Sequence, residues 1–533
     1  MSTHAGRIAQ RLAGAGCRHA FGMPGGEVLV LLEALRAEGI AFQLVKHENN
    51  AGYMAEGSWH ATGAPGILLT TVGPGLANAV NSVANALQEQ VPLIVLSGCI
   101  DAGEAERFTH QVIDQQALMA PVTKASLRVA PGAAAEAVQK ALSIALSDPM
   151  GPVHLDLPVG LADLEAPDAA ISPAPVRAGW TDGASLAGAA RMLAHAERPI
   201  ILAGIGALHH DAGEEITALA REYDIPVLTT YKAKGVVDEH DPLCLGGHGL
   251  SPLSDRFVLP LLQASDCVIL AGYDPIEMRA GWIQPFAAEA AIDLAHARIE
   301  HGMHGAAMRV VGDVRAMVAA LRGAVRQRVH PAWAGGEPAA AREALVEIFK
   351  GPGTWGAHEV FATLQESLPD GAVATVDSGA HRILMTQMWQ CARPGTLLQS
   401  SAFCTMGVAV PLAAGIAAAS DGPVVAVVGD AGFDMTAGEL ATLRDLGRQL
   451  TIVVLRDDSL ALIEKKQAAM QLPGYGVEFS ASDAASVARA YGGKGYDVTN
   501  RVELDAALSE SWQNDCFAVI SCRVSKENYD GAF

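Results

Sequence analysis

Short apolar runs rich in β-branched residues alternate with longer stretches of helical periodicity along the chain. In the first third, we expect strands at Phe42–Val45, Gly66–Thr71, Leu93–Ser97 and Val153–Asp156, and helices at Asn50–Thr62 and Ala77–Gln88. Buried strands separated by helices are typical of a parallel sheet whose two faces are covered by helices. The pattern therefore predicts an α/β fold for this part of the chain.

The same alternation returns twice further along the chain. The second unit has expected strands at Pro199–Ala203, Pro226–Thr229, Cys267–Ala271 and Val310–Gly312, and the third has them at Ala372–Val376, Val424–Val428, Leu450–Leu455 and Phe517–Ser521. Between these units, Leu161–Gly179 and Pro331–Pro338 lack periodicity and predict linkers. We therefore expect three α/β domains, over residues 1–165, 185–325 and 342–533. The pattern leaves open whether the first and third domains share one architecture.

Composition agrees with several well-packed domains and excludes one class of partner. The chain has 533 residues, of which 50% are apolar and 18% are charged. This is enough apolar material for several cores, and the chain is too long for a single one. The formal net charge is −21. Because an acidic surface repels a phosphate backbone, we expect no general binding to nucleic acid.

The hydropathy of the chain predicts neither a secreted protein nor a membrane protein. The segment Met1–Arg11 is polar and has no apolar core of the kind that signal peptides carry. The most apolar stretch, Val408–Val428, is interrupted by Pro411 and Pro423, so it predicts a buried helix and a strand rather than a membrane span. The eight cysteines show no C-x-x-C spacing, which favours reduced thiols over disulfides or a zinc site. We expect a cytoplasmic protein.

The segment with the most candidate metal- and phosphate-binding residues is 424–463. A predicted strand runs into a Gly-Asp-Ala-Gly turn at residues 429–432 and then a helix expected over Thr436–Leu446, and the next strand ends just before Asp457. Because the ends of neighbouring parallel strands meet at one edge, Asp430 and Asp457 can share a cation such as Mg²⁺, which bridges carboxylates to phosphates. The same residues also fit an ordinary helix start and an ordinary turn.

These features resemble the thiamine-diphosphate enzymes of the acetolactate synthase and pyruvate decarboxylase superfamily. The hallmark of that family is a Gly-Asp-Gly turn followed by a metal-binding Asn or Asp. Here Ala431 replaces the last Gly, and Arg456-Asp457 stands where many members have Asn-Asn. Asp at this position is similar to the catabolic acetolactate synthases. By this resemblance, the side chains of Asp430 and Asp457 and the carbonyl of Ser459 hold Mg²⁺.

Further segments resemble motifs of the same family, in the same order. They are the glutamate segment Val45–Gly57, the turn Thr70–Asn78, the His-Gln segment Thr109–Asp114, the middle-domain segment Gly272–Glu277 and the segment Thr405–Pro411. The middle-domain segment looks catabolic and lacks the Arg-Phe-Asp-Asp-Arg pattern of the flavin-binding synthases, so FAD is not expected. The resemblance covers nearly the whole chain. It implies an N-terminal pyrimidine-binding domain, a Rossmann-like central domain and a C-terminal diphosphate-binding domain.

The resemblance also implies roles for individual residues. Glu48 matches the carboxylate that bonds the aminopyrimidine ring of the cofactor and shares a proton with it. Met406 matches the bulky residue that keeps the cofactor bent, and the backbone near Cys404 would accept from the 4′-amino group. The expected cofactor contacts are Glu48, Pro74, Asn78, Ser378, Gly379, His381, Cys404, Met406, Gly429, Asp430, Ala431, Gly432, Asp457, Ser459 and Leu460.

Four residues are expected to meet the substrate. His110 and Gln111 would face it from the first domain as a proton-relay and hydrogen-bonding pair, although a solvated loop pair is the alternative. Phe403 and Leu460 would shape an apolar pocket for small aliphatic groups. In this family the site lies between subunits, so the resemblance implies a homodimer at minimum and a homotetramer as the usual assembly.

The implied function is decarboxylation of a 2-oxo acid with carboligation, and in the acetolactate synthase case two pyruvates give 2-acetolactate and CO₂. Leu460 and the residues after it differ from the Tyr-Asn-Met-Val that the family has there. Another small 2-oxo acid or an aldehyde therefore stays open as substrate. A simple decarboxylase, an aldehyde carboligase or a carbon–carbon lyase is the alternative, and a non-catalytic regulatory relative is a distant one.

Overall fold

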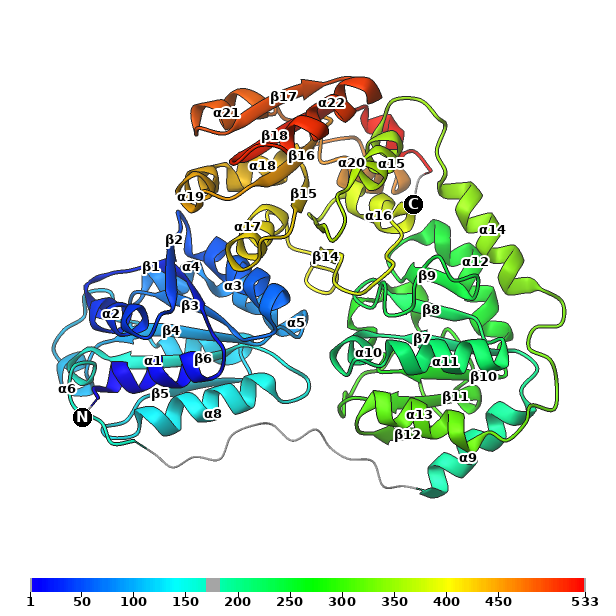
Figure 1. Cartoon of the computed structure of the whole chain (residues 1–533), viewed down its shortest axis with the longest axis horizontal. Coiled ribbons are helices and arrows are strands. Elements are labelled where there is room, and N and C mark those ends of the chain that lie inside the picture. The colour runs from blue at the N-terminus through cyan, green and yellow to red at the C-terminus, as the bar shows by residue number, and fades with distance from the viewer. Residues whose placement is uncertain (1, 169–182, 532–533) are drawn as a thin grey trace.

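Three six-stranded sheets follow one another along the chain, and every strand pairing in them is parallel (Figure 1). The structure, a computed structural model, describes residues 2–168 and 183–531. Most of the predicted linker Leu161–Gly179 therefore lies outside the described residues. Helices flank each sheet, so the predicted α/β class with three parallel sheets is confirmed.

The N-terminal sheet has the strand order β2-β1-β3-β4-β6-β5. Its strands are β1 (His19–Met23), β2 (Ala41–Leu44), β3 (Gly66–Thr70), β4 (Leu93–Cys99), β5 (Ala125–Arg128) and β6 (Val153–Pro158). Its helices are α1 (His4–Gly14), α2 (Leu29–Ala37), α3 (Glu48–Thr62), α4 (Pro74–Asn78), α5 (Val80–Gln88), α6 (Ala102–Ala105), α7 (Gln115–Met119) and α8 (Ala134–Leu146). The predicted helix Ala77–Gln88 is wrong as a single element, because the chain breaks at Ala79 between α4 and α5.

The middle sheet has the order β12-β11-β10-β7-β8-β9, which is the doubly wound order of Rossmann-like domains. Its strands are β7 (Pro199–Ala203), β8 (Val227–Thr230), β9 (Cys244–His248), β10 (Cys267–Ala271), β11 (Ala291–Ala295) and β12 (Met308–Val311). Its helices are α9 (Gly183–His195), α10 (Ile205–His209), α11 (Gly213–Tyr223), α12 (Pro252–Ala264) and α13 (Val314–Ala324), and α14 (Glu337–Phe349) leads to the third domain.

The C-terminal sheet has the order β14-β13-β15-β16-β18-β17. Its strands are β13 (Val373–Val376), β14 (Leu397–Gln399), β15 (Val424–Gly429), β16 (Leu450–Arg456), β17 (Lys494–Val498) and β18 (Phe517–Arg523). Its helices are α15 (Ala357–Ser367), α16 (Ala380–Met388), α17 (Ala409–Ala419), α18 (Asp430–Thr436), α19 (Leu440–Leu446), α20 (Ala461–Ala469), α21 (Ala484–Ala490) and α22 (Arg501–Ser511). Numbered within each domain, this is the strand order of the N-terminal sheet.

Two buried helices join the N- and C-terminal domains. Helix α3 packs on α17 (Figure 1), and the apolar cluster around them contains side chains of both domains. The approach is close because a Cβ at Gly57 would lie 2.2 Å from the carbonyl oxygen of Leu412, and one at Gly415 would lie 2.0 Å from that of Met54. A helix that is apolar on all sides is typically buried, which is how residues 408–428 form α17 followed by β15. Among the described residues, no helix is long and apolar enough to cross a membrane.

The Gly-Asp-Ala-Gly segment differs from its prediction. The predicted turn followed by a helix over Thr436–Leu446 is wrong, because α18 already begins at Asp430. The carboxylate of Asp430 accepts a hydrogen bond from the N–H of Ala431 at 2.9 Å, so the side chain itself stabilises the first turn. A short 3-10 turn, Ala437–Glu439, then separates α18 from α19.

Candidate active site

A cavity of about 190 Å³ lies where β13, β15 and β16 end. It is lined by Ser378, Gly379, Ala380, His381, Cys404, Met406, Gly429, Asp430, Ala431, Gly432, Asp457, Ser459, Leu460, Ala461, Leu462 and Ile463. All the cofactor-contact residues predicted in the C-terminal domain are in this set. The carboxyl ends of the strands are where open α/β sheets bind their ligands.

Asp430 and Asp457 meet across the ends of two neighbouring strands, β15 and β16. One carboxylate oxygen of Asp430 accepts from the N–H groups of Asp457, at 3.1 Å, and Asp458, at 2.7 Å. Burial, together with the nearby charge of Asp430, raises the pKa of Asp457 to about 7. Burial also raises the pKa of Asp430. A buried carboxylate and a half-buried one placed together favour a cation between them.

Two more polar groups in the cavity are buried without a partner among the described residues. They are the hydroxyl of Ser378 and Nε2 of His381. Burial lowers the pKa of His381 to about 3, so its ring is neutral. Buried polar atoms normally have hydrogen-bond partners, so these two leave capacity for a ligand in the cavity.

Residues 400–407, hereafter the cofactor loop, lie between β14 and α17 and include Cys404 and Met406. Asp377 holds its far end by accepting from the N–H groups of Gly407, at 3.0 Å, and Val408, at 2.8 Å. Cys404 has a φ of +57°, a left-handed conformation that costs energy in a non-glycine residue. The surrounding contacts must therefore fix this loop.

Glu48 lies in the N-terminal domain, at the first residue of α3. It is 6% exposed, and its carboxylate accepts from the side-chain amide of Asn78 at 2.9 Å. Pro74 and Asn78 begin and end the short helix α4. The three predicted residues of this domain thus form a second group, and none of them lines the cavity that contains Asp430.

The predicted substrate residues are divided in the same way. Leu460 lines the cavity with Asp430, whereas Phe403 lines another, of about 560 Å³, together with Asn78. His110 and Gln111 are exposed on a loop of the N-terminal domain, and the backbone of Gln111 lies beside Gly73. A single chain therefore holds two half-sites, one around Glu48 and one around Asp430.

Thiamine diphosphate and Mg²⁺ fit the residues of the second half-site. Its donors are the carboxylates of Asp430 and Asp457 with the hydroxyl and imidazole described above, a set suited to a hard cation and a phosphate group. No cluster of three or more His, Cys, Asp or Glu with metal-binding geometry occurs in the described part of the chain, so cofactor and backbone oxygens would complete the shell. The cavity is smaller than the ~300–1,000 Å³ of sites that enclose a whole ligand.

Two residues that sequence reasoning missed hold these half-sites in place. Asp377 is one of them. It follows strand β13 and directly precedes the predicted site residue Ser378, and this position in the sequence could have identified it as a site residue. The other is Glu439, a buried C-terminal-domain residue whose carboxylate accepts from the N–H groups of Lys46 and His47, both at 3.0 Å. That contact spans 392 residues, and no local pattern could predict it.

Models of one enzyme family match all three domains. Residues 3–118 match the N-terminal, 186–321 the central and 377–522 the C-terminal domain of thiamine pyrophosphate enzymes, the N- and C-terminal models being described as cofactor-binding. The chain belongs to this family of thiamine-diphosphate-dependent enzymes. The sheets of the first and third models carry the two half-sites described above.

Among the curated proteins that are similar to this chain are acetolactate synthases and a decarboxylase. The chain is 27% identical to an acetolactate synthase of Bacillus subtilis, with 93% of this chain and 88% of the relative covered. It is 29% identical to a probable 2-ketoarginine decarboxylase, AruI, of Pseudomonas aeruginosa, with 91% and 87% covered. It is also 29% identical to a probable acetolactate synthase large subunit of Methanocaldococcus jannaschii, with 95% and 89% covered.

Proposed function

We propose that this chain is a thiamine-diphosphate- and Mg²⁺-dependent enzyme that decarboxylates a small 2-oxo acid and joins the product to a second carbonyl compound, as an acetolactate synthase does. The observation that carries this proposal is the cavity in which residues following three separate strands meet, with the buried carboxylate of Asp430 and the half-buried carboxylate of Asp457 at its edge. Family membership and the named relatives support the same reaction class.

The residues around Asp430 would hold the diphosphate end of the cofactor. Asp430 and Asp457 would bind Mg²⁺ through their carboxylates and Ser459 through its carbonyl, with phosphate oxygens as the remaining ligands. Ser378 and His381 have the unpartnered polar atoms that a phosphate group would satisfy. Met406 would support the bent cofactor from below, and the backbone at Cys404 would accept from its amino group.

Glu48 would hold the proton that the cofactor needs for activation. When bound, the cofactor supplies a carbanion that adds to the carbonyl of a 2-oxo acid. Glu48 is buried and bonded to Asn78, so its carboxyl is oriented and shielded from water. From that position it would share a proton with the aminopyrimidine ring. His110 and Gln111 would bind the substrate carboxylate from the same domain.

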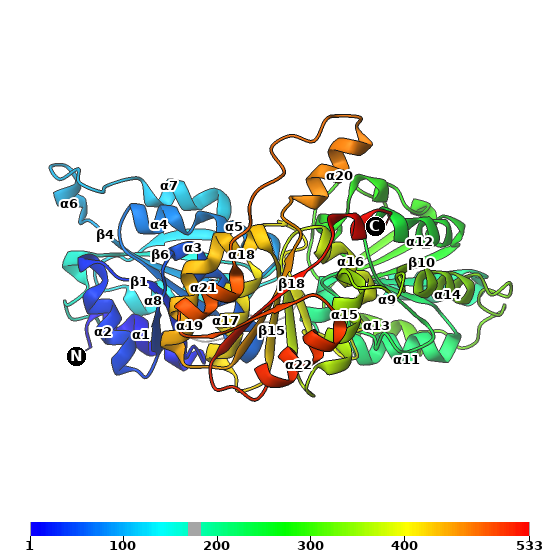
Figure 2. The ribbon, with the colours of Figure 1, turned by 90° about the horizontal axis from the view of Figure 1, so that it is seen from above.

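Because Glu48 and Asp430 occupy separate half-sites of one chain, we propose that the active site is completed by a second copy. Exposed apolar side chains on and around α20, which protrudes in Figure 2, support such a contact. Tyr475 is 86% and Met470 70% exposed, and large exposed apolar groups of this kind mark interaction surfaces. A homodimer is then the smallest active form, and a homotetramer is consistent with it.

Three finer points belong to the same proposal. We assign domain boundaries at residues 1–165, 185–325 and 342–533, close to the three sheets. We assign no flavin to the middle domain. The cysteines are all free and six of them are buried, which supports a reducing compartment, the cytoplasm.

The alternative reaction is decarboxylation without carboligation, which the relative named as a 2-ketoarginine decarboxylase favours. Both reactions use the same cofactor half-sites, so only the products separate them. The purified chain should be incubated with thiamine diphosphate, Mg²⁺ and a panel of 2-oxo acids and aldehydes, with cofactor omitted as control. Acetolactate from pyruvate alone supports the proposal, and free aldehyde from every 2-oxo acid supports the alternative. Cofactor-independent turnover, or no turnover of any 2-oxo acid, would contradict both.

A further inference from the structure

The cofactor loop is held from a second side by a residue of the N-terminal domain, Glu89. One oxygen of this carboxylate accepts from the N–H groups of Ala402, at 2.9 Å, and Phe403, at 3.1 Å. Glu89 is only 5% exposed. It follows α5 and is remote in sequence from the loop, so this contact joins two domains at the residues directly before Cys404.

The other oxygen of Glu89 pairs with the middle domain. It lies 2.9 Å from Nζ of Lys232, and both side chains are nearly fully buried. Burial alone would lower the pKa of Lys232, but the charges of Glu89 and Glu277 outweigh it and raise the pKa. Lys232 is therefore charged and neutralises Glu89 away from water. The carboxylate of Glu89, in the N-terminal domain, thus contacts both the middle domain and the cofactor loop of the C-terminal domain.

We propose that Glu89 is a positioning residue that fixes the cofactor loop in the conformation that Cys404 and Met406 need to receive thiamine diphosphate. This inference rests on the function proposed above. Its strongest support is the order of the contacts along the loop, because two N–H groups anchored by Glu89 immediately precede the left-handed residue Cys404, and Asp377 anchors the residues that follow Met406. A strained residue persists only where its surroundings determine it.

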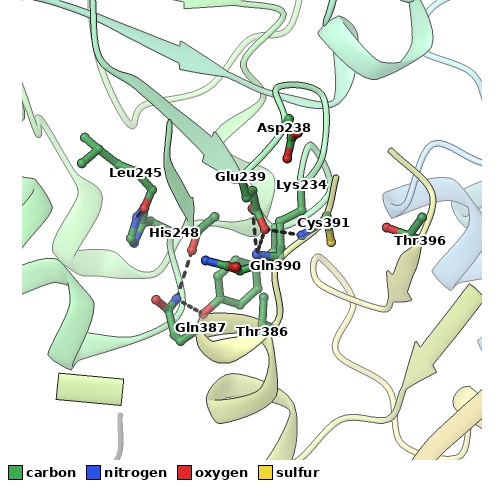
Figure 3. Close-up of polar contacts among 12 residues, drawn as sticks. Lys234, Asp238, Glu239, Leu245, His248, Thr386, Gln387, Gln390, Cys391 and Thr396 are labelled. Atoms are coloured by element: carbon green, nitrogen blue, oxygen red, sulfur yellow. Dashed lines mark hydrogen bonds and ion pairs between the residues drawn. The ribbon is translucent and has the colours of Figure 1, made fainter. Parts of the chain in front are cut away.

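A second buried ion pair in the same protein provides a matched control. Lys234 and Glu239 lie 2.8 Å apart with side chains 3% and 4% exposed, as Figure 3 shows. Glu239 also accepts from a backbone N–H of the C-terminal domain, that of Cys391, at 2.7 Å. This pair has the same chemistry and burial as Glu89 and Lys232, but it contacts no residue of the cofactor loop or of the cavity with Asp430.

The test replaces each pair by apolar residues of similar size, giving Glu89→Leu/Lys232→Met and Glu239→Leu/Lys234→Met in the full-length chain. Hydrogen exchange of peptides covering residues 400–407 is measured without cofactor, and the affinity for thiamine diphosphate with Mg²⁺ is measured by titration. We expect the Glu89 double variant to show about tenfold faster exchange in the loop and about tenfold weaker cofactor binding, because two amides lose their acceptor. The Glu239 double variant should change neither quantity.

Two single variants keep the test decisive if the double variant does not fold. Glu89→Gln retains an oxygen that can accept from the loop and should shift both quantities less than about threefold, whereas the shorter Glu89→Asp should shift both by more. Unchanged loop exchange in the Glu89 double variant, or in Glu89→Asp if only that variant folds, would overturn the proposal. So would faster exchange with unchanged cofactor affinity, or equal effects in the Glu239 control. If the unmodified chain binds no thiamine diphosphate, the proposed function is wrong and the positioning role falls with it, even where loop exchange responds.

Discussion

The N- and C-terminal domains have the same strand order but carry different chemistry at the same edge of the sheet. In the N-terminal domain, the strand before α3 leads to one buried carboxylate, Glu48, bonded to Asn78. In the C-terminal domain, residues after three strands gather around a cavity with Asp430 and Asp457. The fold supplies two similar scaffolds, and the residues at the strand ends give each one a different chemistry.

Each domain also anchors the functional segment of the other. Glu439 of the C-terminal domain holds the backbone of Lys46 and His47 next to Glu48. Glu89 of the N-terminal domain holds the backbone of the cofactor loop. The helices α3 and α17, which follow these segments, pack directly on each other. Packed helices and hydrogen bonds therefore join the two segments inside one chain.

The largest effect is expected from the N-terminal half-site. Glu48→Gln should lower kcat by about 10²–10⁴-fold, the usual contribution of a proton-transferring group, because an amide cannot share a proton with the cofactor. Cofactor affinity should change much less, since the residues proposed to bind the diphosphate lie in the other domain. Steady-state kinetics and a cofactor titration check this, with the exposed Glu33→Gln as control. Near-normal kcat would remove Glu48 from the mechanism.

A substitution in the C-terminal half-site should change the affinity for the cofactor rather than kcat. Asp430→Ala should weaken the Mg²⁺-dependent binding of thiamine diphosphate by about 10–100-fold or more, as the loss of metal-site residues does. Asp434 lies one turn further along α18, is exposed and does not line the cavity, so Asp434→Ala is the matched control. Isothermal titration calorimetry of both variants with thiamine diphosphate and Mg²⁺ tests this prediction. Equal cofactor affinities of the two variants would mean that the metal binds elsewhere.

The two carboxylates also predict how metal binding depends on pH. Without metal, the pKa of Asp457 is raised to about 7, and Mg²⁺ must displace that proton. Lowering the pH below 7 should therefore weaken Mg²⁺ binding by about tenfold per pH unit, with little change above pH 8. Asp457→Asn has no proton to displace there, so its affinity should vary less with pH. A wild-type affinity that is flat between pH 5.5 and 7 contradicts the assignment.

The smallest effect concerns the helix contact that couples the half-sites. Gly57→Ala adds a Cβ against the backbone of α17 and should destabilise the chain by about 1–3 kcal/mol, the usual cost of overpacking. Gly323 in α13 has open space around it, so Gly323→Ala should stabilise by about 0.5–1 kcal/mol. Chemical denaturation measures both. Equal unfolding free energies would mean that α3 and α17 are not tightly packed in solution.

Local patterns predicted the parts of this structure that depend on local sequence. The predicted strands and the pairing of Asp430 with Asp457 followed from buried β-branched runs and from the rule that parallel strands end at one edge. Six strands were not predicted, and they are β1, β5, β9, β11, β14 and β17. The helix start at Asp430 was only the alternative because a Gly-Asp-Ala-Gly run indicates a turn, whereas the Asp430 side chain bonds to the first turn of a helix. The break at Ala79 was missed for a similar reason, since helical periodicity continues through it.

Contacts between domains were beyond what one sequence can predict. Glu89 and Glu439 each bond backbone N–H groups more than three hundred residues away, and backbone donors leave no trace in side-chain patterns. The separation of Glu48 from the cavity with Asp430 was implied only by the family resemblance. Its physical basis, two similar sheets joined back to back through α3 and α17, became visible only in the structure (Figure 1).

The central claim is that two chains build one active site from different domains, and mixing two inactive variants tests it most directly. At a cofactor concentration that saturates the wild type but lies well below the dissociation constant of the Asp430→Ala chain, the Glu48→Gln and Asp430→Ala chains should each be nearly inactive alone. After they are unfolded together and refolded, or co-expressed, a two-fold symmetric dimer restores one intact site in each mixed pair, so about a quarter of the wild-type activity should return. Activity that stays at the level of the separate variants, with mixed dimers shown to be present, would mean that Glu48 and Asp430 of the same chain act together and would contradict the account.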